Sequence, residues 1–186
     1  MPSVQFQNPV CDPNKPRAVV DYMKWMTTLQ IKQDLDQHKK NFSILLVNID
    51  YDNNSGNIIR TANALGAKEV ILYGRRNFDR RSSMGTEFYM DFQQIKFVEE
   101  IDDILKDYDI IVGLENGIEA QNLINYKWDK TKKTLICLGQ EGNGIPAEIL
   151  AKCNDLVEIP QVGSVRSLNV GTAAGIVMYD YCVKVS

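Results

Sequence analysis

Residues 43–73 read SILLVNIDYDNNSGNIIRTANALGAKEVILY, and this stretch sets the fold class of the chain. It opens with a continuous apolar run, residues 43–49, which is typical of a strand buried on both faces. A turn-forming cluster of Asp, Asn, Ser and Gly follows, and then a helical pattern runs through Ala64 and ends at Gly66. A second apolar run, residues 69–73, predicts the next strand. Strand, helix and strand in this order are typical of a parallel sheet that helices cover.

The rest of the chain continues this alternation. Further strands are expected over three short runs, residues 109–114, 134–138 and 155–159. A helix is expected over residues 101–106, before the first of these runs. A longer helix should close the chain, because one apolar stripe at helical spacing comprises Val170, Ala173, Ala174, Val177, Met178 and Tyr181. We therefore predict an α/β fold with a parallel sheet flanked by helices.

The segment before the first strand is expected to form a helical extension over residues 1–40. Within it, residues 17–38 predict an amphipathic helix. The apolar side chains at helical spacing are Val19, Tyr22, Met23, Met26 and Leu29. The main domain is then expected over residues 41–186.

The composition narrows the classes of function. The chain has 186 residues with 21 Lys and Arg against 24 Asp and Glu, so overall charge alone would not hold a nucleic acid. The four cysteines form no C-x-x-C pair and the single histidine, His38, lies in a polar stretch. We therefore expect no metal site and no histidine-based nucleophilic catalysis. No apolar run is long enough to span a bilayer and no targeting segment is visible, so a cytoplasmic protein is expected.

Three loops rich in Gly, Asn and Ser follow predicted strands, at residues 52–60, 139–144 and 160–169. Ligands of open α/β sheets bind beyond the carboxyl ends of the strands, so a site is expected where these loops meet. The middle loop places its glycines in the order G-x-x-G-x-G, which is not the dinucleotide fingerprint G-x-G-x-x-G. The chain also has no P-loop motif. An oxidoreductase that holds a dinucleotide in this loop is therefore disfavoured.

Three sequence motifs occupy these loops. They are NSGNIIRTA at residues 54–62, LGQEGNG at residues 138–144, and IPQVG at residues 159–163 continuing to SLNV at residues 167–170. In order and spacing they are similar to N-x-G-x-x-x-R-T-A, to G-N-E-G-x-G, and to I-P-x-x-G with S-L-N-V. These are the motifs of the SpoU (TrmH-like) RNA methyltransferases of the SPOUT superfamily, which the chain thus resembles. Gln140 stands where that family usually has Asn.

The resemblance covers roughly residues 43–183 and implies both a fold and an activity. It implies a sheet whose C-terminal segment is threaded into a deep trefoil knot, and a homodimer with the knot helices at the interface. It also implies that S-adenosylmethionine binds backbone groups of the second and third motifs. The matching positions are Leu138, Gly139, Gly144, Ile159, Leu168 and Asn169. The implied reaction is methylation of a ribose 2′-hydroxyl in a tRNA or rRNA.

Five polar side chains match the catalytic positions of the family: Asn54, Arg60, Glu141, Ser167 and Asn169. Arg60 corresponds to the family's arginine, either as the base or as a group that pairs with phosphate and stabilises alkoxide charge. Guanidinium holds its proton strongly, which favours the second role. Asn54 is expected to orient Arg60 or the RNA, and Glu141 to fix the Arg60 fork. The alternative is that Asn54 and Ser167 cap helices, Asn169 stabilises a turn and Glu141 is a solvated acid.

An arginine cluster is the candidate for RNA contact. Arg75, Arg76, Arg80 and Arg81 lie in a stretch with aromatic residues and one acid, which suits phosphate pairing and base stacking. The alternative is a solvated surface loop. With about forty residues before the first strand, RNA capture would rest on this loop, on a dimer surface or on a partner protein. A non-catalytic RNA-binding or adaptor protein on the same fold is the second hypothesis, although such a protein would be expected to lose some of the five polar residues.

Overall fold

The computed structural model describes Arg17 and residues 19–47, 52–74, 80–97, 99–117, 119–140 and 142–186, with the backbone alone for residues 52 and 53. The strands are β1 (Phe42–Val47), β2 (Glu69–Tyr73), β3 (Asp91–Ile95), β4 (Ile110–Leu114), β5 (Gln121–Asn122), β6 (Thr134–Leu138) and β7 (Asp155–Glu158). The α-helices are α1 (Thr28–Asp36), α2 (Asp52–Ala64), α3 (Arg80–Ser83), α4 (Glu99–Leu105), α5 (Ala147–Leu150) and α6 (Val170–Val185). Short 3-10 helices are η1 (Asp21–Met23), η2 (Thr86–Phe88) and η3 (Leu123–Asn125).

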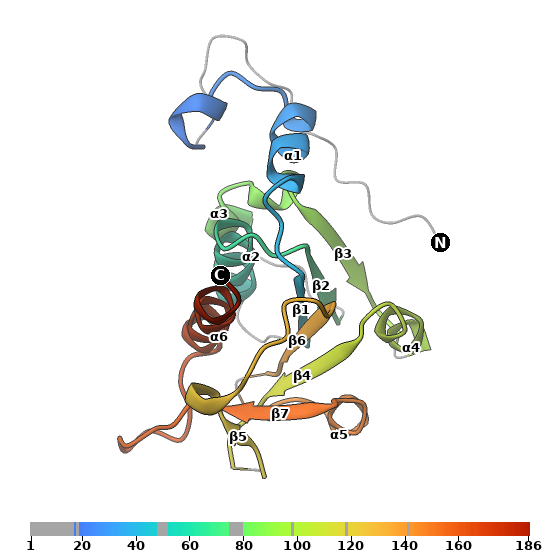
Figure 1. Ribbon diagram of the computed structural model, residues 1–186, viewed down its shortest axis with the longest axis vertical. Coiled ribbons are helices and arrows are strands. Elements are labelled where there is room, and N and C mark those ends of the chain that lie inside the picture. The colour runs from blue at the N-terminus through green and yellow to red at the C-terminus, as the bar shows by residue number, and fades with distance from the viewer. Residues whose placement is uncertain are drawn as a thin grey trace.

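Among the described residues, seven strands form one parallel sheet in the order β3-β2-β1-β6-β4-β7-β5 (Figure 1). β1 lies inside this sheet, where Ile44 aligns with Val70 of β2 on one side and with Ile136 of β6 on the other. All six residues of β1 are buried, as expected for a strand that is covered on both faces. The predicted α/β fold with a parallel sheet is confirmed.

The side chains of the sheet alternate between two apolar cores. Ile44 and Leu46 of β1 belong to the core that α2 and α6 close, and these two helices lie on one side of the sheet (Figure 1). Leu45 belongs to the opposite core, together with Ile101 of α4 and Ile149 of α5. Helices therefore flank both faces of the sheet, as predicted.

The longest described helix, α6, carries the predicted apolar stripe into the first core. Its buried residues are Val170, Ala174, Val177, Met178, Tyr181 and Cys182. The ring of Tyr181 packs 4.7 Å from the ring of Phe42, centroid to centroid, and so ties α6 to β1. Neither α6 nor any other described helix combines the length and the apolar character that crossing a membrane needs.

Two strands lie outside the predicted set because they are not apolar. The sequence of β3 is DFQQI, and only its last residue is buried. The other, β5, has two residues, one exposed and one half-buried. Both lie at edges of the sheet, where a strand needs no continuous apolar run. Neither strand can therefore be found from apolar runs in the sequence.

The predicted N-terminal helix is only partly correct. The stretch forms η1 and α1 rather than one helix, because Thr27 starts α1 with a capping box. The Thr27 hydroxyl accepts the Gln30 N–H at 3.2 Å, and the Gln30 side chain accepts the Thr27 N–H at 2.8 Å. Met23 is buried, whereas Tyr22 and Leu29 are exposed, so the predicted single apolar stripe is wrong.

Candidate functional site

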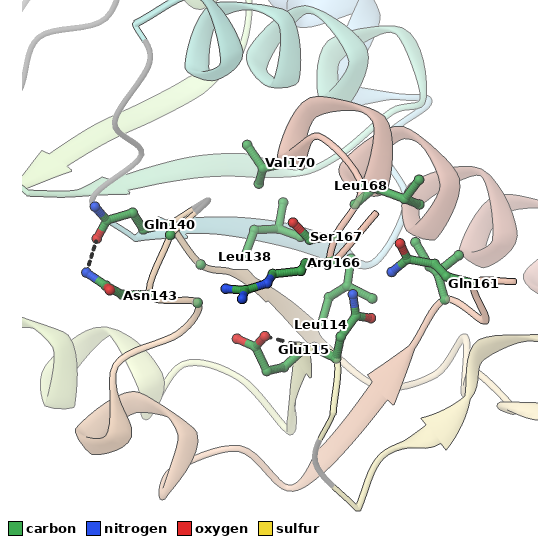
Figure 2. A pocket seen from close by; sticks show the side chains of 16 residues that line it. Leu114, Glu115, Leu138, Gln140, Asn143, Gln161, Arg166, Ser167, Leu168 and Val170 are labelled. Atoms are coloured by element: carbon green, nitrogen blue, oxygen red, sulfur yellow. Dashed lines mark hydrogen bonds between the residues drawn. The ribbon is translucent and has the colours of Figure 1, made fainter. Parts of the chain in front are cut away.

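A pocket of about 530 Å³ lies beyond the carboxyl ends of β4, β6 and β7 (Figure 2). Its described walls come from residues 114–116, from residues 138–140 and 142–144, and from residues 159–173. The volume falls within the range of about 300–1,000 Å³ that is usual for small-molecule sites. Two of the three loops predicted to meet at this edge of the sheet therefore do so.

Six residues of the predicted site line this pocket: Leu138, Gly139, Gly144, Ile159, Ser167 and Leu168. The side chains of Leu138, Ser167 and Leu168 surround it in Figure 2. Of the predicted catalytic and cofactor-binding residues, Asn54, Arg60 and Asn169 are not part of its walls. Glu141, Arg75 and Arg76 lie outside the described residues, so their predicted roles stay predictions.

A tight glycine turn forms one wall of the pocket. The Gln140 N–H donates to the Gly144 carbonyl at 3.0 Å, and the Gly144 N–H donates to the Gln140 carbonyl at 2.8 Å. Gly144 has a φ of 67°, a left-handed conformation that favours glycine. A Cβ atom on Gly139 would overlap the backbone of Gly144 and Ile145. The turn therefore brings bare backbone to the pocket wall, as a ligand that is read by N–H and C=O groups requires.

Asn169 joins the third motif to the first. Its side-chain oxygen accepts the N–H groups of Gly171 and Thr172 at 2.9 and 3.2 Å and so caps α6. Its side-chain amide donates to the Asn54 side-chain oxygen at 3.1 Å, and Asn54 is buried. The pairing places α2 beside the start of α6, one residue beyond Leu168 of the pocket wall. The sequence left open a structural role for Asn169, and in the structure Asn169 is the N-cap of α6.

Replacing Asn169 by Ala should lower the stability of the fold by about 0.5–2 kcal/mol, because two N–H groups of α6 lose their cap. Thermal unfolding of the purified variant measures this effect, with an expected fall of a few degrees in the melting temperature. Asn169→Ser is the control, since its hydroxyl still accepts at the cap but the link to Asn54 is lost. A serine variant as unstable as the alanine variant would show that the link, and not the cap, stabilises the fold.

Arg60 lies on α2, six residues after Asn54, and its side chain is exposed. Its neighbours Ile58 and Ile59 are buried in the core, so α2 holds Arg60 on its outer side. An exposed guanidinium outside the pocket walls is available to a ligand larger than the pocket. Glu141 lies outside the described residues, so the predicted contact between Arg60 and Glu141 stays a prediction.

The two described arginines of the predicted RNA-binding loop belong to a helix. Arg80 and Arg81 begin α3 rather than continuing a loop. The Arg80 guanidinium lies 5.5 Å from the centroid of the Phe88 ring, and its Nε atom lies 3.8 Å from a carboxylate oxygen of buried Glu87. Arg80 is therefore anchored against η2, and it is about half exposed.

The polar lining residues that sequence reasoning missed include Glu115, Asn116, Gln161 and Arg166. Glu115 accepts the N–H groups of Ile145 and of its own neighbour Asn116, at 2.8 and 3.1 Å, and so braces the glycine turn. A Cβ atom on Gly144 would overlap this carboxylate. Glu115 could have been found from the sequence, because it directly follows the predicted strand at residues 109–114, where ligand-binding residues are expected. Arg166 extends across the pocket toward Glu115 in Figure 2.

A pair of thiols lies behind the pocket. Cys137, the residue before Leu138, is buried, and its hydrogen bond with Cys153 and its burial raise its pKa. A buried thiol with a raised pKa is a poor nucleophile. Cys137, Cys153 and Cys182 are all free thiols, and no group of His, Cys, Asp and Glu in the described part of the chain could hold a metal ion.

Known proteins resemble this chain in both sequence and fold. A TrmH family tRNA/rRNA methyltransferase of Staphylococcus aureus (strain MSSA476) is 30% identical over 156 residues, which are 81% of this chain and 62% of that relative. The SpoU methyltransferase AviRb from Streptomyces viridochromogenes, solved with its cofactor AdoMet, superposes with a TM-score of 0.68. It is 27% identical, with 78% of this chain and 58% of AviRb covered. A TrmH/SpoU tRNA modifying enzyme of A. aeolicus shares the fold, with a TM-score of 0.74 at 22% identity over 84% of this chain and 81% of its own.

The profile of the SpoU rRNA Methylase family matches residues 41–179, which include all three motifs and every described wall of the pocket. The chain spans less than two thirds of the Staphylococcus relative, so the match concerns this domain and not the whole of that protein. By this match and by its three motifs, the chain belongs to the SpoU rRNA methylase family.

Proposed function

We propose that this protein transfers a methyl group from S-adenosylmethionine to a ribose 2′-hydroxyl of a tRNA or rRNA. The observation that carries the proposal is the pocket itself. Its walls are the second and third SpoU motifs, and it opens at the edge of the sheet where α/β proteins bind nucleotides. AviRb, a relative with the same fold, is a methyltransferase that binds AdoMet.

The pocket residues fit this cofactor. Apolar side chains of Leu114, Leu138 and Leu168 offer surfaces for a flat base and a methylene chain. The glycine turn provides backbone groups for hydrogen bonds, in space that a Cβ atom on Gly139 would otherwise fill. Among the described lining residues, Arg166 can pair with a carboxylate and Glu115 with a cationic group.

The chemistry needs little from the protein beyond orientation and charge stabilisation. S-adenosylmethionine, when bound, would supply a methyl group that its sulfonium already activates, with S-adenosylhomocysteine as the leaving group and the 2′-hydroxyl proton passing to water. Arg60, exposed on α2, would pair with an RNA phosphate and stabilise negative charge on the 2′-oxygen. Ser167 offers its hydroxyl at the pocket wall to the ribose of the substrate. Holding both reactants in line accounts for much of the expected acceleration.

Two measurements, made one after the other, test the proposed function. Calorimetric titration with S-adenosylmethionine should show one site per chain. Labelled methyl groups should then pass to RNA and resist alkaline hydrolysis as dinucleotides, because a methylated 2′-oxygen cannot attack the neighbouring phosphate. No cofactor binding would overturn the proposal, whereas binding without any transfer would favour the non-catalytic RNA-binding protein.

We infer a homodimer formed through α6. Ile176, Tyr179 and Val183 lie one helical turn apart on this helix and are 39%, 63% and 56% exposed. An apolar strip of this kind on the outside of a helix marks an interaction surface. It supports the dimer that the family resemblance implies.

Ile176→Asp should convert such a dimer to a monomer, because a buried carboxylate at the interface would lack a partner. Light scattering after gel filtration measures the mass directly. Leu29→Asp is the matched control, since Leu29 is a 65% exposed apolar residue on α1 and its change should leave the mass unaltered. A wild-type protein that elutes as a monomer would contradict the inferred dimer.

We also propose the trefoil knot, the division of the chain near residue 40 and a cytoplasmic location. The order of the parallel strands and the return of the chain from β7 to α6 are compatible with the knot. The family match begins at residue 41, which supports the boundary. Three free thiols among the described residues suit a reducing compartment.

We propose that RNA contacts the segment of Arg75, Arg76, Arg80 and Arg81. Replacing these four residues with Ala should weaken RNA binding and flatten its dependence on salt, by about 0.7–0.9 in log–log slope for each phosphate that no longer has a cationic partner. A salt series of binding isotherms measures the slope. Four exposed lysines, Lys127, Lys130, Lys132 and Lys133, allow a control in which the same amount of positive charge is removed. Equal slopes for the wild type and the arginine variant would rule out this segment as the RNA contact, and RNA capture would then fall to another surface or a partner protein.

A further inference from the structure

Gln161 contributes a buried polar group to the pocket that no contact in the described structure explains. It lies two residues after Ile159, in the third motif, and its side chain lines the pocket. Its side-chain oxygen is buried and has no hydrogen-bond partner among the described residues. Buried carbonyl oxygens of this kind are uncommon, because desolvation without a partner is unfavourable.

The other buried side-chain atoms that have no hydrogen-bond partner in the described part of the chain lie elsewhere. They belong to Ser43, Glu87 and Tyr181, and none of these residues lines the pocket. Of these four residues, Gln161 is therefore the one whose unpaired oxygen a ligand in the pocket could reach. Its oxygen requires a donor, so the ligand must present an N–H or O–H group at this point.

The surroundings of Gln161 favour a flat, apolar ring that carries such a donor. In Figure 2 Gln161 and Leu168 are drawn at one end of the pocket, with Leu114 between Gln161 and Glu115, whereas Gln140 and Asn143 lie at the opposite end. Glu115 and Arg166 lie between these two ends. The Gln161 end is therefore lined by leucines, and the charged side chains lie away from it. A purine with an exocyclic amino group combines the ring and the donor that this end calls for.

We propose that the Gln161 side-chain oxygen accepts a hydrogen bond from the amino group of adenine, and that Gln161 thereby selects adenosyl over inosyl ligands. This inference rests on the proposed function, because it names the part of the cofactor that the leucine-lined end holds. An inosyl ligand presents a carbonyl oxygen where adenosine has its amino group. Two acceptors would then face each other in a buried place, which is unfavourable for binding.

The test compares two thioether ligands, S-adenosylhomocysteine and S-inosylhomocysteine, by calorimetric titration. The wild type should bind the adenosyl compound about 10- to 100-fold more tightly. Gln161→Met keeps the length of the side chain and removes the acceptor. It should bind the adenosyl compound about tenfold more weakly than the wild type and lose most of the preference. Gln33→Met is the matched control, since Gln33 is an exposed glutamine on α1 outside the pocket walls, and the preference of this variant should stay that of the wild type.

The outcomes separate this inference from the proposed function. A wild type that binds S-adenosylmethionine but shows no preference between the two thioethers overturns the role of Gln161 and leaves the proposed function intact. If Gln161→Met still prefers the adenosyl thioether as the wild type does, the role of Gln161 is likewise overturned and the proposed function stays intact. A wild type that binds none of the three ligands overturns both proposals. Thermal unfolding of each variant without ligand checks that the variant is folded, so that differences in affinity are differences between folded proteins.

Discussion

Arg60→Ala is expected to lower the rate of methyl transfer to RNA by about 100- to 1,000-fold, the usual effect of removing one group that stabilises developing charge. Its effect on S-adenosylmethionine affinity should be less than about threefold, because exposed Arg60 is not part of the pocket walls. Labelled transfer into RNA and calorimetric titration measure the two quantities separately.

The Arg60→Lys variant sharpens this experiment. Lysine keeps the positive charge but loses the planar fork that binds two phosphate or carboxylate oxygens at once. We expect a rate between those of the wild type and the alanine variant if charge and geometry both contribute. Transfer that survives in Arg60→Ala at near wild-type rate would remove Arg60 from the mechanism. A large loss of cofactor affinity would instead assign Arg60 to the pocket.

Gly139→Ala should abolish measurable cofactor binding, with a loss of at least about 100-fold. The new Cβ atom would meet backbone atoms of Gly144 and Ile145, which cannot rotate aside as a side chain can. The two hydrogen bonds between Gln140 and Gly144 would have to open, and the pocket wall would move. Overpacking of this kind also costs about 1–3 kcal/mol of stability.

The matched control lies three residues away in the same turn. A Cβ atom on Gly142 would meet nothing within 4 Å, so Gly142→Ala should bind S-adenosylmethionine like the wild type. Titration and thermal unfolding of both variants make the comparison. Equal affinities would mean that the glycine turn does not form the binding wall. A loss in both variants would mean that the turn must flex, which a fixed backbone wall does not require.

The sequence predicts the parts of this protein that depend on a strong local pattern. The run at residues 43–49 predicted β1, because a strand covered on both faces is largely apolar along its length. The polar edge strand β3 has no such pattern, because its place is decided by pairing with β2. The break before α1 could have been read from Thr27 and Gln30, since a capping box is a local signal.

The candidate site was predictable where it follows the family motifs and not where it depends on packing. Gly139 and Gly144 come from a motif, and the structure gives them a physical reason in the close approach of backbone. The missing partner of Gln161 cannot be read from sequence, because burial of one oxygen results from the whole pocket. The same holds for the pairing of Asn54 with Asn169, which lie 115 residues apart in the chain.

The position of β1 between β2 and β6 has a consequence for how the chain reaches its folded state. β2 follows β1 closely, but the partner on the other side pairs Phe42 with Thr134, about 90 residues further along. During synthesis, the backbone N–H and C=O groups on one edge of β1 therefore stay unpaired until most of the protein has been made. Pairings of such long separation also make refolding slow, on a scale of milliseconds to seconds or longer. A chain released before residue 134 would keep that edge open, and aggregation should be its main fate.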